Sequence, residues 1–164
     1  MMGPSHAATG AAAWIVLGPL AHVNPGAVAA TIPLAAFAAL GPDIDHPKAT
    51  ISRILPFIAW PIQQVTTHRI EMHSLPVAAV LIGAVYPFIG LAVTAAVAVG
   101  WVVGHIGADC LTDKGCALLW PLTRARFGLG LLTTGKIGER IYTIILGPMV
   151  LLYYVFAIKN GWLA

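Results

Sequence analysis

Long apolar segments alternate with short polar islands along this chain of 164 residues. Five segments are apolar enough for membrane-embedded helices, although the first two are short against the roughly 20 residues that cross a bilayer. They cover residues 7–21, 27–40, 75–89, 91–110 and 141–158. We therefore expect an all-α fold, a polytopic membrane helical bundle with four to five membrane-embedded helices, in a single domain over residues 1–164.

Two breaks organise this pattern. The turn sequence Asn24-Pro25-Gly26 separates the first two segments, and Pro87 to Gly90 separates the third from the fourth. Asn, Pro and Gly in such positions are typical of tight turns. We expect each pair of segments to run out and back across the membrane.

The segment 48–67 has a different pattern. Apolar residues recur at intervals of three and four, with polar residues between them, which predicts one apolar helix face. These apolar positions are Ile51, Ile54, Leu55, Ile58 and Ile62. Pro56 and Pro61 should break the helix. We expect an interfacial amphipathic segment that lies on the membrane.

Composition supports a membrane protein. Hydrophobic residues make up 59% of the chain and charged residues only 9%, against roughly 25% charged residues in soluble domains. The start of the chain has no basic region before its first apolar segment, so we expect no removable signal peptide. Cys110 and Cys116 have neither metal-knuckle nor disulfide-framework spacing, which favours packing thiols.

The out-and-back path places the polar islands on one membrane face. Eight potential metal ligands share this face: His6, Asp43, Asp45, His46, His68, His73, His105 and Asp109. Of the nine Lys and Arg, all but Lys159 share it too, so the positive-inside rule predicts that it is cytoplasmic and that residues 162–164 lie outside. Alternatively, some of these cations serve an anionic substrate and do not report topology.

Three of the polar islands carry chemistry. In Gly-Pro-Asp-Ile-Asp-His-Pro at 41–47, carboxylates and an imidazole offer the oxygen and nitrogen ligands of divalent metals, or else a turn or helix cap. His105 and Asp109, four residues apart, share a helix face, where Gly104 and Gly107 allow close approach. They can bind one metal or simply each other. Ionisable residues at the end of an apolar span favour the functional reading.

The third island, 68–74, is weaker evidence by itself. His68 and His73 can each reach a metal, and Arg69 can hold a phosphate oxygen through its planar guanidinium; the alternative is a solvated polar loop. His6 is a lone imidazole before the first apolar segment, which is more typical of a surface or capping residue. The simplest interpretation of a further basic segment, with Lys114, Arg124 and Arg126, is that it binds anionic lipid headgroups.

Taken in order, these motifs resemble the YdjM-like family of bacterial inner-membrane proteins, described as membrane-bound metal-dependent hydrolases. The resemblance rests on His6, Pro-Asp-Ile-Asp-His-Pro at 42–47, His68-Arg69, His73-Ser74, His105 with Asp109, Leu111-Thr112, Trp120-Pro121, Arg126-Phe127 and Glu139-Arg140. The family is similar to zinc-dependent phospholipases C and zinc single-strand nucleases, which are helical enzymes with clustered metals and a His-x-x-x-Asp pair. The family's His-Arg-Gly-x-Thr-His-Ser reads His68-Arg69-Ile70-Glu71-Met72-His73-Ser74 here, so Glu71 is an added candidate ligand or base.

The resemblance implies phosphoester hydrolysis at the bacterial inner (plasma) membrane. The eight ligands would hold one or more divalent metal ions, with zinc as first choice and manganese or iron second. Arg69 would neutralise charge on the phosphate, and Asp45 or Glu71 would accept the proton of a metal-activated water. We expect membrane lipids as partners, a phospholipid or lipid phosphate as substrate, and no nucleic acid.

Two other readings compete with the hydrolase. One is a non-catalytic membrane adaptor or sensor with a structural metal, which would show closed four-ligand coordination. The other is a metal-ion or proton transporter, which should carry carboxylates near the middle of its spans. The sequence places them at the ends of the spans.

Overall fold

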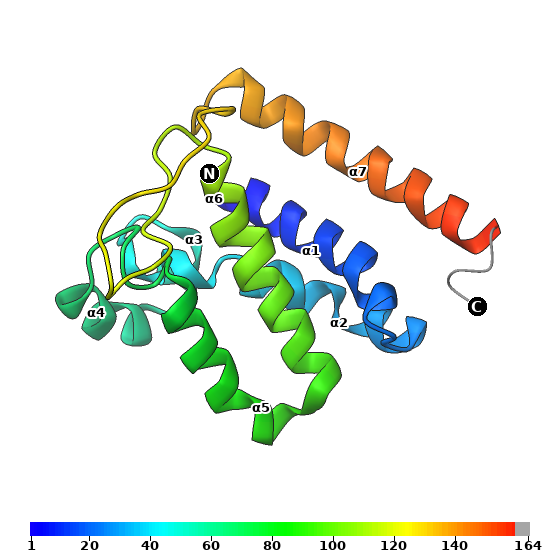
Figure 1. Ribbon diagram of the computed structural model, residues 1–164, viewed down its shortest axis with the longest axis horizontal. Coiled ribbons are helices and arrows are strands. Elements are labelled where there is room, and N and C mark those ends of the chain that lie inside the picture. The colour runs from blue at the N-terminus through cyan, green and yellow to red at the C-terminus, as the bar shows by residue number, and fades with distance from the viewer. Residues whose placement is uncertain (160–164) are drawn as a thin grey trace.

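Helices form most of the fold and follow the apolar segments of the sequence (Figure 1). The computed structural model describes residues 1–159, and within this range extended pairing is limited to two isolated β-bridges. The all-α expectation is confirmed. The elements are α1 (Gly3–Leu20), α2 (Pro25–Ala38), the 3-10 helix η1 (Gly41–Asp45), α3 (Thr50–Ile54), α4 (Pro56–Val65), α5 (Leu75–Ala98), the π-helix η2 (Val99–Gly107), α6 (Ala108–Cys110) and α7 (Ile137–Lys159).

The first two helices form a hairpin, as the turn sequence predicts. The side chain of Asn24 caps α2 by accepting a hydrogen bond of 2.8 Å from the backbone N–H of Gly26. Trp14 is fully buried between the helices, and its indole N–H donates to the hydroxyl of Thr31 at 2.8 Å. A buried indole with a satisfied donor anchors the two helices to each other.

Three helical stretches are long and apolar enough to cross a membrane: Pro25–Asp45, Leu75–Cys110 and Ile137–Ala157. The middle stretch has 36 residues, and Gly90 interrupts it with a left-handed φ of 72°. The chain therefore turns back near Gly90, and the two arms stand side by side in Figure 1. The predicted break is confirmed, and counting α1 and both arms gives the four to five embedded helices expected.

Large apolar side chains cover the outside of these helices. Phe88 and Leu91 at the turn of the α5 hairpin are 85% and 70% exposed, and Ile144 on α7 is 72% exposed. Soluble proteins rarely leave such continuous apolar surface open to water. The exposed face therefore suits contact with lipid chains.

Residues 48–67 form two short helices, α3 and α4, in place of one broken helix. Pro56 occupies the first position of α4 and coincides with the break, whereas Pro61 lies inside α4. The expected break at Pro61 is therefore wrong, because an interior proline removes only one backbone hydrogen bond from this short helix. Ile51 is buried against the core, while Phe57 is 93% exposed, which agrees with an amphipathic segment.

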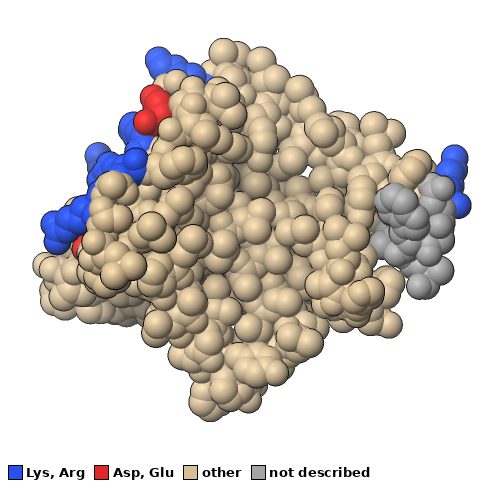
Figure 2. All heavy atoms as spheres, viewed as in Figure 1, with Lys and Arg blue, Asp and Glu red and all other residues tan. Residues whose placement is uncertain are grey.

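Charge is concentrated at one end of the bundle. Figure 2 shows Lys and Arg along one edge of the molecule, beside the loops, while the surface over the helices is almost free of charge. Lys159 ends α7 at the opposite end. This arrangement matches the eight-to-one distribution read from the sequence. Residues 162–164, predicted to lie on the outer side of the membrane, are beyond the described residues.

The two cysteines pack in the core. Both Cys110 and Cys116 are free and buried, with their sulfur atoms 3.5 Å apart. They contact Ala78 and Ile106 in one hydrophobic cluster. Neither belongs to a potential metal-binding group among the described residues, so the expectation of packing thiols is confirmed.

Candidate metal centre

Seven of the eight predicted ligands gather at one end of the bundle, from four separate segments of the chain. They form three overlapping groups, and within each group one ligand atom per residue lies within 4.8 Å of the others. We name them the inner group (His6, His105, Asp109), the central group (Asp43, His73, His105) and the outer group (Asp45, His68, His73). Together these seven residues are called the cluster below.

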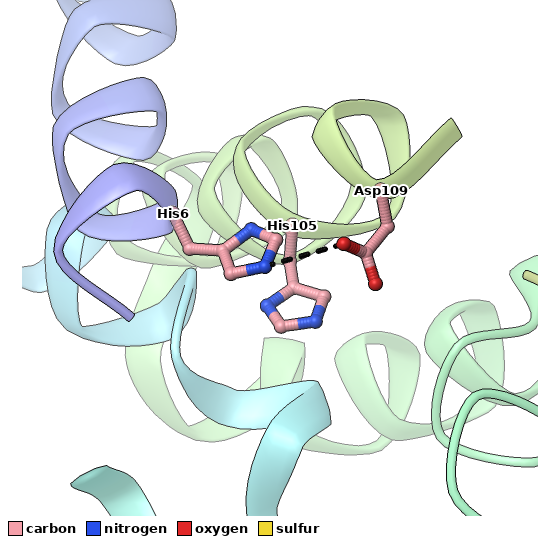
Figure 3. A group of neighbouring side chains, drawn as sticks. All are labelled: His6, His105 and Asp109. Atoms are coloured by element: carbon pink, nitrogen blue, oxygen red, sulfur yellow. Dashed lines mark ion pairs between the residues drawn. The ribbon is translucent and has the colours of Figure 1, made fainter. Parts of the chain in front are cut away.

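The inner group depends on a π-helix that the sequence argument did not foresee. His105 lies in η2 and Asp109 follows in α6. The four-residue spacing between them therefore runs partly through a π-helix, whose turns contain more residues than those of an α-helix. The two side chains still converge: Figure 3 shows His6 of α1 reaching past His105 towards Asp109, with His6 Nε2 3.5 Å from Asp109 Oδ1. Single π-turns are common at functional sites.

Backbone carbonyls orient both inner imidazoles. His105 Nδ1 lies 2.6 Å from the carbonyl oxygen of Ala39, and His6 Nδ1 lies 3.2 Å from that of Gly104. Each carbonyl oxygen can accept a hydrogen bond from Nδ1–H, and in a neutral imidazole that arrangement leaves the Nε2 lone pair available for a metal. The two rings stack with centroids 3.7 Å apart. Metal-bound histidines are usually oriented by such hydrogen bonds, which sequence cannot reveal because the acceptors are main-chain atoms.

Close backbone packing holds the inner group together. A Cβ atom on Gly104 would lie 2.5 Å from the Cα of Gly10, and one on Gly100 would lie 2.2 Å from the carbonyl oxygen of Ala35. The predicted close approach at Gly104 is therefore confirmed. At Gly107 the nearest atom would be 3.4 Å away, so that glycine is not required for packing.

The outer group is more accessible. His68 Nδ1 lies 2.7 Å from Asp45 Oδ1, and the His68 side chain is 34% exposed. His73 links this group to the others: its Nδ1 lies 3.5 Å from Asp45 Oδ2, and its Nε2 lies 3.0 Å from His105 Nε2. Burial alone would lower the pKa of His73, but the carboxylates of Asp43 and Asp45 outweigh burial and raise that pKa above its usual value. The two carboxylates thus favour the protonated, positively charged form of His73.

Several ligand atoms of the cluster are buried without a hydrogen-bond partner. Four of the six such side-chain atoms among the described residues belong to it: His6 Nε2, Asp45 Oδ2, His73 Nδ1 and Asp109 Oδ2. Of these, Asp109 Oδ2 makes no hydrogen bond but forms an ion pair with Arg69 Nη1 at 3.2 Å. An unsatisfied buried polar atom costs about 1–3 kcal/mol. Imidazole and carboxylate lone pairs are the ligands of zinc and similar divalent ions, so this donor set fits a metal.

Arg69 lies against the cluster. It is buried, has a left-handed φ of 66°, and places Nη1 and Nη2 3.2 and 3.3 Å from the two carboxylate oxygens of Asp109. Nη1 also donates to the carbonyl oxygen of Gly115 at 3.1 Å. The amine of Met1 contacts the same carboxylate. Arg69 thus meets a protein carboxylate directly, and its predicted contact with a substrate phosphate stays a prediction.

Besides Arg69, two predicted site residues lie outside the three groups. The Nδ1 of His46 accepts the backbone N–H of Lys48 at 3.2 Å, and burial, together with neighbouring His68, lowers the pKa of His46. The carboxylate of Glu71 accepts a hydrogen bond from the backbone N–H of Thr67 at 2.6 Å and so stabilises the loop over residues 67–71. The ring of His46 contacts that of His68, with centroids 4.7 Å apart, but neither His46 nor Glu71 belongs to a group of described residues that could hold a metal.

A buried acid that sequence reasoning did not assign a role lies close by. Glu139, in the first turn of α7, is 1% exposed and accepts backbone N–H groups from Met2 at 2.5 Å and Gly135 at 2.6 Å. An acid in the first helical turn is the usual signal for such a contact. Glu139 attaches α7 to the start of the chain beside the cluster.

A polar cavity of about 570 Å³ opens beside the cluster. Its lining includes Asp43 and His68 of the cluster, together with His46 and Arg69. This volume falls within the range of roughly 300–1,000 Å³ typical of small-molecule sites. The cavity therefore gives a ligand access to the outer and central groups.

The comparisons with known proteins agree with this architecture. A family model described as "YdjM inner membrane protein" matches residues 1–163. The inner membrane protein YdjM of Escherichia coli (strain K12) is 39% identical over 110 residues, which cover 64% of this chain and 56% of that protein; the Shigella flexneri protein gives the same values. The chain thus spans little more than half the length of these curated relatives, and no solved structure matches it. The chain belongs to the YdjM family of inner membrane proteins.

Proposed function

We propose that the protein is a membrane-bound, metal-dependent hydrolase that acts on a phosphoester at the membrane surface, such as a phospholipid or a lipid phosphate. One observation carries the proposal: a buried cluster of His and Asp, with ligand atoms that have no hydrogen-bond partner, adjoins a cavity large enough for a small ligand. A purely structural metal would need only a closed set of four ligands.

The residues divide the chemistry between them. The inner, central and outer groups would hold the metal, zinc first and manganese or iron second. When bound, a divalent ion lowers the pKa of water and supplies a nucleophile near neutral pH. Asp45 Oδ2, which has no hydrogen-bond partner, is the candidate acceptor for the proton of that water. Glu71 is engaged with Thr67 and has no part in this scheme.

Arg69 is the candidate for neutralising charge on the phosphate. It lines the polar cavity and at the same time contacts Asp109. Its position lets one guanidinium hold the ligand carboxylate and face an anion in the cavity, since the group carries five N–H donors. The proposed partners are membrane lipids, and no role for nucleic acid enters the proposal.

We also propose that the cluster faces the cytoplasm. The support is the distribution of Lys and Arg, which gather at the cluster end of the bundle. Reporter fusions within loop 123–135 and after residue 164 should report opposite compartments, the loop cytoplasmic. Two fusions reporting the same compartment would contradict this orientation.

A non-catalytic adaptor or sensor with a structural metal is the second candidate. The inner group favours it, because His6, His105 and Asp109 are fully buried and Asp109 is already paired with Arg69. A metal held there alone would have no route to substrate. The two candidates differ in whether the metal keeps an open position beside the polar cavity.

The deciding experiment combines metal analysis with a substrate panel. Protein purified without chelator should contain a transition metal, and metal-loaded protein in nanodiscs should hydrolyse a phospholipid, a lipid phosphate or a generic phosphodiester. Asp109→Ala should lose metal and turnover together, whereas His22→Asn, far from the cluster, should keep both. A fully loaded protein that hydrolyses no member of the panel would favour the adaptor.

A further inference from the structure

The polar cavity has an excess of positive charge. Five Lys and Arg line it, against the single carboxylate of Asp43: Lys48, Arg53, Arg69, Lys114 and Arg126. Arg69 is paired with Asp109. The other four form no ion pair with any residue in the range 1–159. We call these four the cationic rim.

The cationic rim is assembled from distant parts of the chain. Lys48 and Arg53 flank the start of α3, Lys114 follows α6, and Arg126 lies in the long loop before α7. Like charges brought together repel one another, and the repulsion is relieved when an anion binds between them. The fold therefore provides a place for an anion next to the cluster.

The charge of the cluster itself does not supply that anion. Asp109 is already paired with Arg69, and all three carboxylates, Asp43, Asp45 and Asp109, belong to groups that would face the bound metal. One divalent ion with Arg69 is enough to balance them. The positive charge of the cationic rim therefore stays unbalanced when the cluster holds a metal ion. A negatively charged ligand in the polar cavity would balance it.

We propose that the polar cavity selects a substrate whose phosphate group carries at least two negative charges, a phosphomonoester or a diphosphate, over a zwitterionic phosphodiester. This inference rests on the proposed function and names its substrate class. A terminal phosphate presents several oxygens to the planar guanidinium groups of Arg53 and Arg126. A zwitterionic headgroup would instead place its ammonium among four cations, and like charges in contact disfavour binding.

Binding provides the first test. Inorganic pyrophosphate is titrated calorimetrically into metal-loaded protein in nanodiscs of zwitterionic lipid. Arg126→Ala and Lys48→Ala should each weaken binding by about two- to five-fold, the usual effect of one exposed ion pair. Arg124→Ala is the matched control, because Arg124 is exposed like Arg126 but does not line the cavity. Unchanged metal content in all variants shows that the centre is intact.

Two binding results would overturn the inference. If Arg124→Ala weakens pyrophosphate binding as much as Arg126→Ala, the attraction belongs to the whole basic surface. If no variant weakens it, the cationic rim does not hold the anion. A loss confined to Arg126→Ala and Lys48→Ala supports the inference.

Hydrolysis provides the second test and separates the two proposals. A lipid phosphomonoester and its short-chain, water-soluble analogue should each react at least about ten-fold faster than a phosphatidylcholine-type diester, and the double variant of Lys48→Ala with Arg126→Ala should narrow that ratio. Equal rates on all substrates would overturn the selectivity and leave the hydrolase standing. Pyrophosphate binding that depends on Arg126 without any hydrolysis would support the anion site and refute the hydrolase.

Discussion

The inner and outer groups of the cluster use the same residue types in different surroundings. The inner imidazoles are fully buried, stacked, and fixed by carbonyl oxygens of the main chain. The outer group contains His68, which is 34% exposed and borders the polar cavity. Ligands fixed by the main chain favour tight retention of a metal, whereas an exposed ligand leaves room for exchange with water. If the cluster holds a metal as proposed, we expect the inner group to retain it and the outer group to face the ligand.

The largest expected effect comes from breaking the packing behind the inner group. Gly104→Ala would place a Cβ atom 2.5 Å from the Cα of Gly10, and backbone atoms cannot move aside as side chains do. Overpacking of this kind costs about 1–3 kcal/mol, and it would separate His6 from His105. We expect a lower Tm and loss of the metal, measured by thermal unfolding in detergent and elemental analysis.

Gly83→Ala is the matched control for that variant. Gly83 also lies within a helix, α5, but a Cβ atom there would meet nothing within 4 Å. It should therefore keep the Tm and the metal. If Gly104→Ala behaved like Gly83→Ala, the inner group would not depend on close packing.

The next effect is the loss of a shared ligand. His105 belongs to both the inner and the central group, so His105→Ala should weaken zinc affinity by about 100-fold or more, since loss of a mere supporting partner already costs roughly 10–100-fold. His46→Ala is the control, because His46 lies outside the three groups. Competition with a fluorescent chelator measures both, and an equal loss for His46→Ala would make His46 a ligand.

His68→Ala sharpens the comparison between the two groups. Because His68 is partly exposed and belongs only to the outer group, its removal should lower zinc affinity about ten-fold or less. In His68→Ala, kcat for phosphoester hydrolysis should fall by a larger factor than the amount of metal bound per protein. A loss of all metal, as for His105→Ala, would mean that the inner group cannot retain an ion by itself.

Arg69→Lys tests a residue that touches the inner group from the cavity side. The substitution keeps the positive charge beside Asp109 but loses the paired contact of the guanidinium. We expect metal content to be unchanged and phosphoester hydrolysis to slow roughly ten-fold, the scale of one charge-assisted hydrogen bond. An unaffected rate would show that Arg69 only supports Asp109.

Glu71→Gln should have the smallest effect. A glutamine can still accept the backbone N–H of Thr67, so the loop should keep its shape. We expect metal content and kcat within about two-fold of the parent protein, because surface changes away from buried features cost little. A kcat reduced ten-fold or more would restore Glu71 as the base.

The grouping of the candidate ligands at one end of the bundle could be predicted from the sequence, because membrane helices constrain the chain strongly. Once Asn24 and Gly90 mark turns, the out-and-back path fixes which polar islands share an end. His73 and His105, far apart in sequence, thus meet within hydrogen-bond distance as the counting of segments predicts. Their metal-ligating residue types add the chemistry, and no side-chain geometry is needed for that step.

The parts that sequence did not predict depend on local competition for hydrogen bonds. The residue type of Glu71 suits a metal ligand, but its carboxylate accepts a hydrogen bond from the backbone N–H of Thr67, four residues earlier. Arg69 looks free to meet substrate, but Asp109 lies within reach of its guanidinium. The π-helix η2 packs closely against Gly10 of α1 and Ala35 of α2, and its residues carry no pattern that predicts a π-helix.

The turn at Gly90 also sets how deep the protein sits in its lipid environment. The arm over residues 75–89 rises about 22 Å at 1.5 Å per residue, while the hydrocarbon layer is about 30 Å thick. When a hydrophobic span is shorter than the hydrocarbon layer, the mismatch is relieved by local thinning of the bilayer. The bilayer beside this arm of α5 is therefore expected to be thinner than average, which brings lipid headgroups nearer to the cluster and favours thin membranes as hosts for this protein.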